Sequence, residues 1–148
     1  MPSAAPRPPV HLEEALARLR AQARPDQLAG MARFGLTGEG RLGLSVPALR
    51  QLGREIGRDH GLALQLAASG VPDAQILAAY VAEPARFTVA EMNIWVASLA
   101  AWDTCDQACT NAFARSRLAW GPLRSFAWAR RSPMRSRRCM TSGSCTAT

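Results

Sequence analysis

The stretch GVPDAQILAAYVAEP, residues 70–84, has the pattern of a short buried helix between two turn signals. Gly70 marks a turn, and Pro72 suits the first turn of a helix, where its missing N–H costs nothing. Apolar side chains then recur three and four residues apart, at Ile76, Leu77, Tyr80 and Val81. Pro84 cannot continue the helix. The spacing predicts an α-helix that packs into the core.

The segments on both sides repeat this pattern. Ser45 has the position of an N-cap ahead of a helix whose apolar stripe is Leu49, Leu52 and Ile56. Thr88 and Glu91 match the capping box T-x-x-E. The stripe after this box is Met92, Trp95, Val96 and Leu99. Further helices are expected from Gly61, from about Asp103 and from Gly121, with His60 as a cap at the end of the helix that precedes Gly61.

The first part of the chain predicts a helical hairpin, formed by residues 12–23 and 28–34, followed by a glycine-rich loop over residues 35–44. No segment alternates as a strand would. A helix pair therefore recurs roughly every 30 to 35 residues, and such short pairs bury their apolar faces only by stacking on their neighbours. The sequence predicts an all-α fold, either a curved helical-repeat solenoid (an α-α superhelix) or a closed helical bundle.

Charge and composition narrow the class of protein. All 18 basic residues are Arg, against 11 acidic residues, which gives a net charge of +7. Arg favours bidentate contacts with phosphate or carboxylate, although a GC-rich genome gives the same bias. No segment has the roughly 20 uninterrupted apolar residues that a membrane span needs, and the Pro-rich N-terminus lacks the apolar run of a signal peptide. We expect a soluble, cytoplasmic protein.

Three regions are expected along the chain. Residues 1–10 form a disordered lead-in, residues 11–131 form the helical-repeat domain, and residues 132–148 form a basic tail in which apolar periodicity stops. The change at Arg131 favours a truncation or a shift of reading frame that leaves the domain incomplete. A natural disordered tail that attracts nucleic acid is the alternative.

The stretch WDTCDQAC, residues 102–109, places two acids beside an aromatic ring. In one interpretation Asp103 caps a helix, Asp106 lies at the third helical position and Trp102 is a core ring. In the other, a carboxylate beside an aromatic wall stabilises a nearby cation. In both, Cys105 and Cys109 are expected to be buried on the opposite side of the helix. They have no recognised zinc spacing with His11 or His60, so no metal site is predicted.

Five motifs in this order resemble the DNA alkylation repair proteins built from HEAT-like helical repeats. The resemblance covers residues 12–131 and is carried by the stretches MARFG (31–35), LSVPAL (44–49), EIGRDH (55–60), ASG (68–70) and WDTCDQ (102–107). It implies a HEAT-like solenoid whose curved, basic surface holds duplex DNA. Characterised members of the family are glycosylases that remove cationic alkylated purines, of the N3-methyladenine and N7-methylguanine type.

The resemblance also implies roles for single residues. Asp106 takes the position of the catalytic carboxylate that stabilises an oxocarbenium-like sugar, Trp102 that of the catalytic aromatic, and Asp103 serves capping and motif geometry. No metal or organic cofactor is implied, and a complete chain is expected to be a monomer. The residues expected to contact DNA are Arg50, Arg54, Arg58, Arg115 and Arg117.

The chain departs from the family pattern in its length. Family members are longer, and their later helices supply a further Trp and Arg, for which Trp128 and Arg131 are the candidates here, against the simpler interpretation as a core ring and a solvated Arg. The row Arg50, Arg54 and Arg58 has a simpler interpretation too, as a solvated face paired with acids. A non-catalytic helical scaffold that binds nucleic acid or protein, or an inactive truncated member of the family, is therefore the alternative function.

Overall fold

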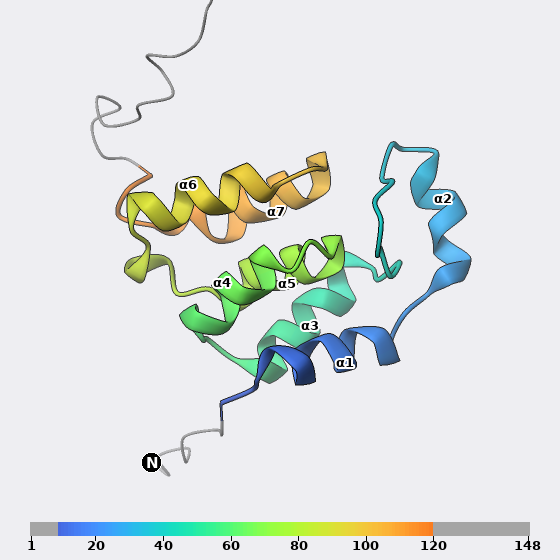
Figure 1. The fold of residues 1–148 in the computed structure, drawn as a ribbon, viewed down its shortest axis with the longest axis horizontal. Helices are drawn as coiled ribbons and strands as arrows, with labels where there is room; N and C mark the ends of the chain where they lie inside the picture. The colour runs from blue at the N-terminus through green and yellow to red at the C-terminus, as the bar shows by residue number, and fades with distance from the viewer. Residues whose placement is uncertain (1–8, 120–148) are drawn as a thin grey trace, which may run out of the picture.

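The computed structural model describes residues 9–119. In this range the chain forms seven α-helices, three short 3-10 helices and no strand, which confirms the all-α class (Figure 1). The α-helices are α1 (Leu12–Ala21), α2 (Leu28–Ala32), α3 (Val46–Ile56), α4 (His60–Ala68), α5 (Pro72–Val81), α6 (Val89–Ser98) and α7 (Trp102–Asn111). The 3-10 helices are η1 (Pro25–Gln27), η2 (Pro84–Arg86) and η3 (Phe113–Arg115).

Several expectations fall outside the described range. They are most of the lead-in, the helix from Gly121, the candidates Trp128 and Arg131, and the tail over residues 132–148. The domain bounds and the truncation therefore stay predictions.

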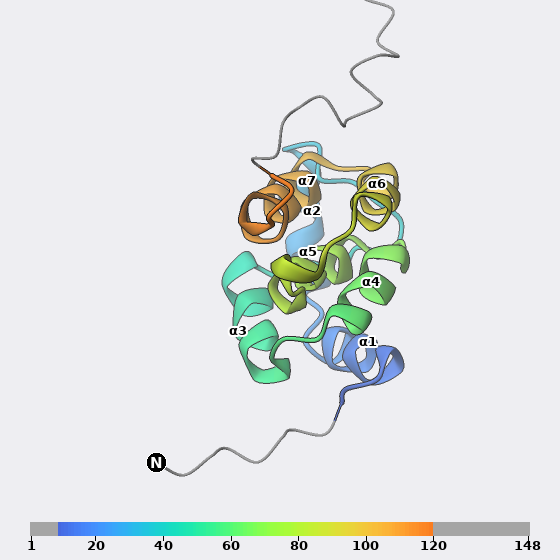
Figure 2. The ribbon, with the colours of Figure 1, turned by 90° about the vertical axis from the view of Figure 1, so that its left-hand side faces the viewer.

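The helices form two layers, with α5 at the centre. Figure 2 shows α1, α4 and α6 on one side and α3, α5 and α7 on the other. Helix α5 packs against α3, α4 and α7, and nine of its residues, Pro72–Ala79 and Val81, are buried. The stretch that the sequence marks as a core helix is thus the one that contacts α3, α4 and α7 together. Stacking of this kind is what helical repeats require, whereas the superhelical course of a solenoid stays a prediction.

The α3–α5 crossing depends on one glycine. A Cβ built on Gly53 would lie 2.6 Å from the Cβ of Tyr80, closer than side chains pack. Ser45 caps α3 as predicted, since its hydroxyl accepts the Ala48 N–H at 3.4 Å. The helix ends at Ile56, because Gly57 adopts a φ of 89° that other residues disfavour.

The two helices of the predicted first hairpin form, as α1 and α2 with η1 between them, but the second does not pack into the core. Helix α2 has no buried residue, and Phe34 is 74% exposed. Its sequence, LAGMA, offers only Leu28 and Met31 for burial, and both are partly exposed. Residues 28–34 instead lead into the loop over 35–44, which runs back along the helices to α3 (Figure 1).

An aromatic cluster fills the end of the core beside α6. Phe87 meets His60, Trp95 and Phe113 edge to face, with ring centroids 4.9 to 5.6 Å apart. His60 is the first residue of α4 and is buried, so its expected role as a helix-end cap is wrong; Asp59 caps this helix by accepting the Leu62 N–H. On α6 the expected stripe is only partly right, because Val96 is 54% exposed.

Candidate nucleic-acid site

Helix α7 begins with the two-acid motif but has no side-chain cap. Ala101 is the N-cap residue, Trp102 is the first helical residue, and Asp103 is the second. Asp106 is therefore the fifth residue, and its expected place at the third position is wrong. The Asp103 carboxylate accepts a single first-turn amide, the N–H of Thr104, at 2.9 Å.

The main partner of Asp103 comes from the glycine-rich loop. Both terminal nitrogens of Arg41 donate to its carboxylate, at 2.7 and 3.1 Å. The Arg41 and Asp103 side chains are only 4% and 12% exposed. A bidentate pair at this depth is strongly directional, so Asp103 fixes where the loop meets α7.

A second carboxylate holds the loop next to Arg41. Asp73, at the start of α5, is 1% exposed and accepts the N–H groups of Leu42 and Leu44 at 2.7 and 2.9 Å. Between them Gly43 has a φ of 82°, and a Cβ there would collide with the backbone oxygen of Arg24. No role for Arg41 or Asp73 was expected from the sequence. The available signals in the sequence were that Arg41 is a lone Arg in a glycine-rich loop and that Asp73 is an acid inside a core helix.

Trp102 and Asp106 both face solvent. Trp102 is 56% exposed, which excludes the core-ring interpretation, and its indole N–H donates to the backbone oxygen of Phe34 at 3.1 Å. The ring of Phe34 is itself exposed. Residues four apart share one face of a helix, so Asp106 lies beside Trp102 on this exposed face.

The two cysteines lie on this face as well. Cys105 and Cys109 are exposed, so their expected burial on the opposite side is wrong. Cys105 is three residues from Trp102, and Cys109 is three residues from Asp106, which makes them helical neighbours. Partial desolvation, followed by the nearby Cys105 and the charge of Asp106, raises the pKa of the Cys109 thiol. This thiol therefore stays protonated, and unreactive, at neutral pH.

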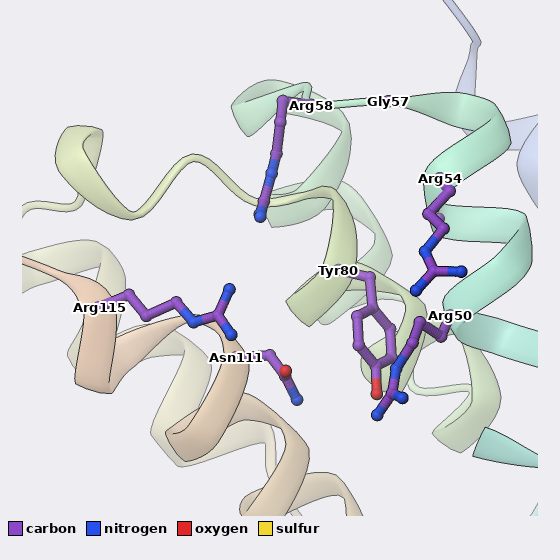
Figure 3. Close-up of a pocket in the computed structure, with 8 residues that line it drawn as sticks. Arg50, Arg54, Gly57, Arg58, Tyr80, Asn111 and Arg115 are labelled. Carbon is purple, nitrogen blue, oxygen red and sulfur yellow. The ribbon is translucent and has the colours of Figure 1, made fainter. Parts of the chain in front are cut away.

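An arginine-lined cleft lies between α3, α5 and α7. Its volume is about 640 Å³. Figure 3 shows its walls, with Arg50 and Arg54 on α3, Arg115 on η3, and Tyr80 between them. The lining residues are Arg50, Gly53, Arg54, Gly57, Arg58, Tyr80, Asn111 and Arg115. Four of the five arginines expected to contact DNA thus meet in one cleft, while Arg117 is exposed outside it.

The cleft arginines are held by contacts that the sequence does not reveal. The Arg50 guanidinium lies 5.7 Å from the centroid of the Tyr80 ring, and Arg58 donates to the backbone oxygen of Ala82. Two acids adjoin this row in the sequence, and both accept hydrogen bonds. Glu55 accepts a hydrogen bond from Gln51, and Asp59 caps α4.

A polar network joins the cleft to α7. The Tyr80 hydroxyl donates to Oε1 of Gln107 at 2.6 Å, and Nδ2 of Asn111 donates to the same oxygen at 3.0 Å. Asp103, Gln107 and Asn111 are spaced four residues apart, so they form one polar stripe along α7 that faces α5 and the loop. Sequence reasoning treated Tyr80 as a core residue and did not consider Asn111. The signal for these residues in the sequence was a polar side chain at every fourth position of α7, at Asp103, Gln107 and Asn111.

A metal site and a membrane-spanning helix are both absent from the described residues. Within residues 9–119 no three His, Cys, Asp or Glu side chains come together as a possible metal site. In the same range no helix has both the length and the apolar run that crossing a bilayer requires.

In the part of the chain that the structure describes, the protein is all-α and has an arginine-lined cleft between α3, α5 and α7. The model of one family, described as DNA alkylation repair enzyme, matches residues 15–141. The chain therefore belongs to this family, and its role lies in DNA repair. The match extends past Arg131, into residues that the structure does not describe. Searches of curated proteins and of solved structures gave no significant match.

Proposed function

We propose that the protein is an alkylpurine DNA glycosylase, which hydrolyses the N-glycosidic bond of cationic purines such as N3-methyladenine and N7-methylguanine. One observation carries the proposal. Of the two acids in the motif, Asp103 is neutralised by Arg41, whereas Asp106 faces solvent beside the exposed ring of Trp102. The motif thus presents a carboxylate and an aromatic face to an incoming substrate.

The chemistry requires little more than such a carboxylate. Alkylation at N3 or N7 gives the purine a positive charge, so the base leaves with the electrons of the bond to C1′ and becomes neutral. The deoxyribose left behind is oxocarbenium-like, as in other glycoside hydrolysis. The Asp106 carboxylate stabilises this positive charge. Water then adds to C1′ and releases one proton, which gives the free base and an abasic site.

Trp102 supplies the second part of this site. An indole ring is the aromatic group that attracts cations most strongly through its face. Because the ring is more than half exposed and its N–H is held by the Phe34 oxygen, its position is fixed while its surface stays available. In the proposed complex it packs against the deoxyribose and favours the cationic state.

The arginine cleft is the proposed site for the DNA backbone. Helix α7 joins the two parts, since Trp102 begins it and Asn111, its last residue, lines the cleft. These two residues are about 14 Å apart along the helix axis, or about four base steps on one strand. In the proposed complex the duplex places its phosphates on Arg50, Arg54, Arg58 and Arg115 while a lesion lies at Trp102 and Asp106. Arg117 extends the basic surface beyond the cleft.

The direct test is base release from methylated duplex DNA, measured by chromatography of the free purines. We expect the native chain to release N3-methyladenine or N7-methylguanine. The Asp106→Asn variant should lose about 10²- to 10³-fold in rate, the loss seen when one charge-stabilising group is removed, with DNA binding kept. Glu13→Gln, at an exposed position of α1, is the matched control and should release bases at the native rate. Equal rates for the native protein and Asp106→Asn contradict the catalytic role of Asp106.

A binding assay tests the cleft separately. The affinity for undamaged duplex DNA should fall steeply with salt, because each neutralised phosphate releases counterions. The double variant Arg50→Gln/Arg115→Gln should bind less tightly, with a salt slope smaller by about two, one for each lost contact. Its control is Arg18→Gln/Arg86→Gln, which removes the same charge away from the cleft. Salt-dependent binding by a native chain that releases no base would indicate the non-catalytic scaffold instead.

A further inference from the structure

We propose that Arg41 is a positioning residue for the reaction. Through its ion pair with Asp103 it fixes the first turn of α7, and with it the placement of Trp102 and the solvent-facing position of Asp106. This inference rests on the proposed function, because Trp102 and Asp106 are the groups that it positions.

The loop contacts the start of α7 at two consecutive residues. The Phe34 oxygen accepts the Trp102 indole N–H, and Arg41 binds the Asp103 carboxylate with both terminal nitrogens. Such a helix start needs outside support, because Ala101 provides no side-chain cap. Phe34, just before the loop, and Arg41 within it therefore act as two fixed points for the turn that presents Trp102.

Arg41 can serve as a fixed point because the chain around it is itself held. The Asp73 carboxylate accepts the amides of Leu42 and Leu44, and Asp73 lies in the buried first turn of α5. The Nε of Arg41 is buried and makes no hydrogen bond among the described residues. The guanidinium is thus committed to Asp103 through its two terminal nitrogens.

The pair also changes the electrostatics of the motif. Two carboxylates three residues apart on a helix repel each other. Because Arg41 neutralises Asp103 in a buried environment, the charge of Asp106 dominates the exposed face next to Trp102. Because of Arg41, Asp103 serves the structure, and Asp106 remains available to the substrate.

The test separates positioning from folding with a double variant. Arg41→Met alone leaves the Asp103 charge buried and can prevent folding. The double variant Arg41→Met/Asp103→Leu removes both charges and should fold. Arg41→Lys keeps the charge but loses the two-pronged geometry. The matched control is Arg24→Met/Asp26→Leu, which removes an exposed ion pair of the same type.

Two readouts are taken from each folded variant. The first is hydrogen exchange of the Trp102 indole N–H, assigned in nitrogen-15 spectra with Trp102→Phe. The second is the single-turnover rate of base release, with DNA affinity measured beside it. We expect the double variant to exchange this proton at least about tenfold faster and to release bases about 100-fold more slowly, the cost of a displacement near 1 Å, at unchanged affinity. Arg41→Lys should fall between it and the native chain, and the control should match the native chain.

The proposal is overturned if the folded double variant keeps both the native indole exchange and the native release rate. Native exchange with slow release would also contradict it, because the effect would then not pass through Trp102. If the native chain releases no base, the proposed glycosylase function fails. The indole exchange of the double variant then decides by itself whether Arg41 positions Trp102.

Discussion

The first turns of α6 and α7 both carry acids, but they use them differently. At α6 the Thr88 hydroxyl accepts the Glu91 N–H at 3.3 Å, and the Glu91 carboxylate accepts the Thr88 N–H at 2.8 Å. This capping box closes within four residues. At α7 no side chain caps the helix, and Asp103 binds Arg41, which lies 62 positions earlier in the chain.

The difference shows when an acid near a helix start can be interpreted from its neighbours. The capping box is complete in the local sequence, so T-x-x-E predicted it correctly. The acids of WDTCDQAC have the same local preferences, yet one is buried by a distant Arg and the other remains in solvent. Four predictions test this contrast, from the largest expected effect to the smallest.

Asp103→Asn should destabilise the protein by about 3 to 5 kcal/mol, because it leaves the buried Arg41 guanidinium without its counter-charge. Asp106→Asn, a surface change of the same kind, should stay within about 0.5 kcal/mol of the native protein. Urea unfolding followed by circular dichroism measures both. If both variants lost a similar free energy of unfolding, Asp103 and Asp106 would contribute equally to the fold. That result would contradict the structural role assigned to Asp103 alone.

Gly53→Ala and Gly30→Ala compare a glycine at a helix crossing with a glycine that has no neighbour near its Cβ position. A Cβ at Gly53 would press on Tyr80, so α3 and α5 must separate, at a cost of about 1 to 3 kcal/mol. Gly30→Ala in α2 meets no atom within 4 Å and should be neutral or slightly stabilising. The midpoints of thermal unfolding decide the matter. If Gly30→Ala is the more harmful change, then helix propensity outweighs packing at these two positions.

Thr88→Ala should cost about 1 kcal/mol, the usual effect of losing an N-cap side chain. The loss of stability stays local, because neither residue of the capping box takes part in the packing of α3, α5 and α7. Base release should therefore remain at the native rate in folded protein, while the denaturant midpoint falls. If base release fell as much as in Asp106→Asn, the start of α6 would be coupled to the candidate site. The contrast between the starts of α6 and α7 would then not hold.

The smallest effect is the pH dependence of this box. Hydrogen bonds from the Thr88 backbone and hydroxyl, aided by nearby His60, hold the pKa of Glu91 below its ordinary value of 4.5. Since the folded pKa is the lower one, the stabilisation is present above the ordinary value and disappears as pH falls through the folded pKa. The stability gap between native protein and Thr88→Ala should thus narrow as pH falls from about 6 to about 3. A gap that is constant over this range would mean that Glu91 does not contribute to the box.

The sequence was most reliable where a signal and its partner lie within one turn. The helix from Ser45 and the box at Thr88 were predicted with their caps, and the core helix over Pro72–Val81 was predicted with Pro72 in its first turn. The errors concern which face of a helix is buried. Cys105 and Cys109 were assigned to the core because they are small and apolar, but the stripe of α7 that meets α5 and the loop contains Asp103, Gln107 and Asn111.

The candidate site shows the same division. The sequence supplied the motif, the family and the arginines that meet in the cleft, because each of these is a residue type at a fixed local spacing. It did not supply Arg41, Asp73 or Tyr80. Nothing adjacent in the chain distinguishes a lone loop Arg that stays in solvent from one that reaches a buried acid.

By itself, then, the sequence determined an all-α chain, the order of its helices and the caps at Ser45 and Thr88, since helical periodicity and capping are local free-energy preferences. It also determined the family. Only the tertiary structure decided which of two neighbouring acids is structural, that Trp102 is exposed, and that arginines from α3 and η3 share a cleft. These properties depend on desolvation and on geometry between distant segments. Burial of Asp103 is stable only because the fold delivers the Arg41 charge within 2.7 Å of it.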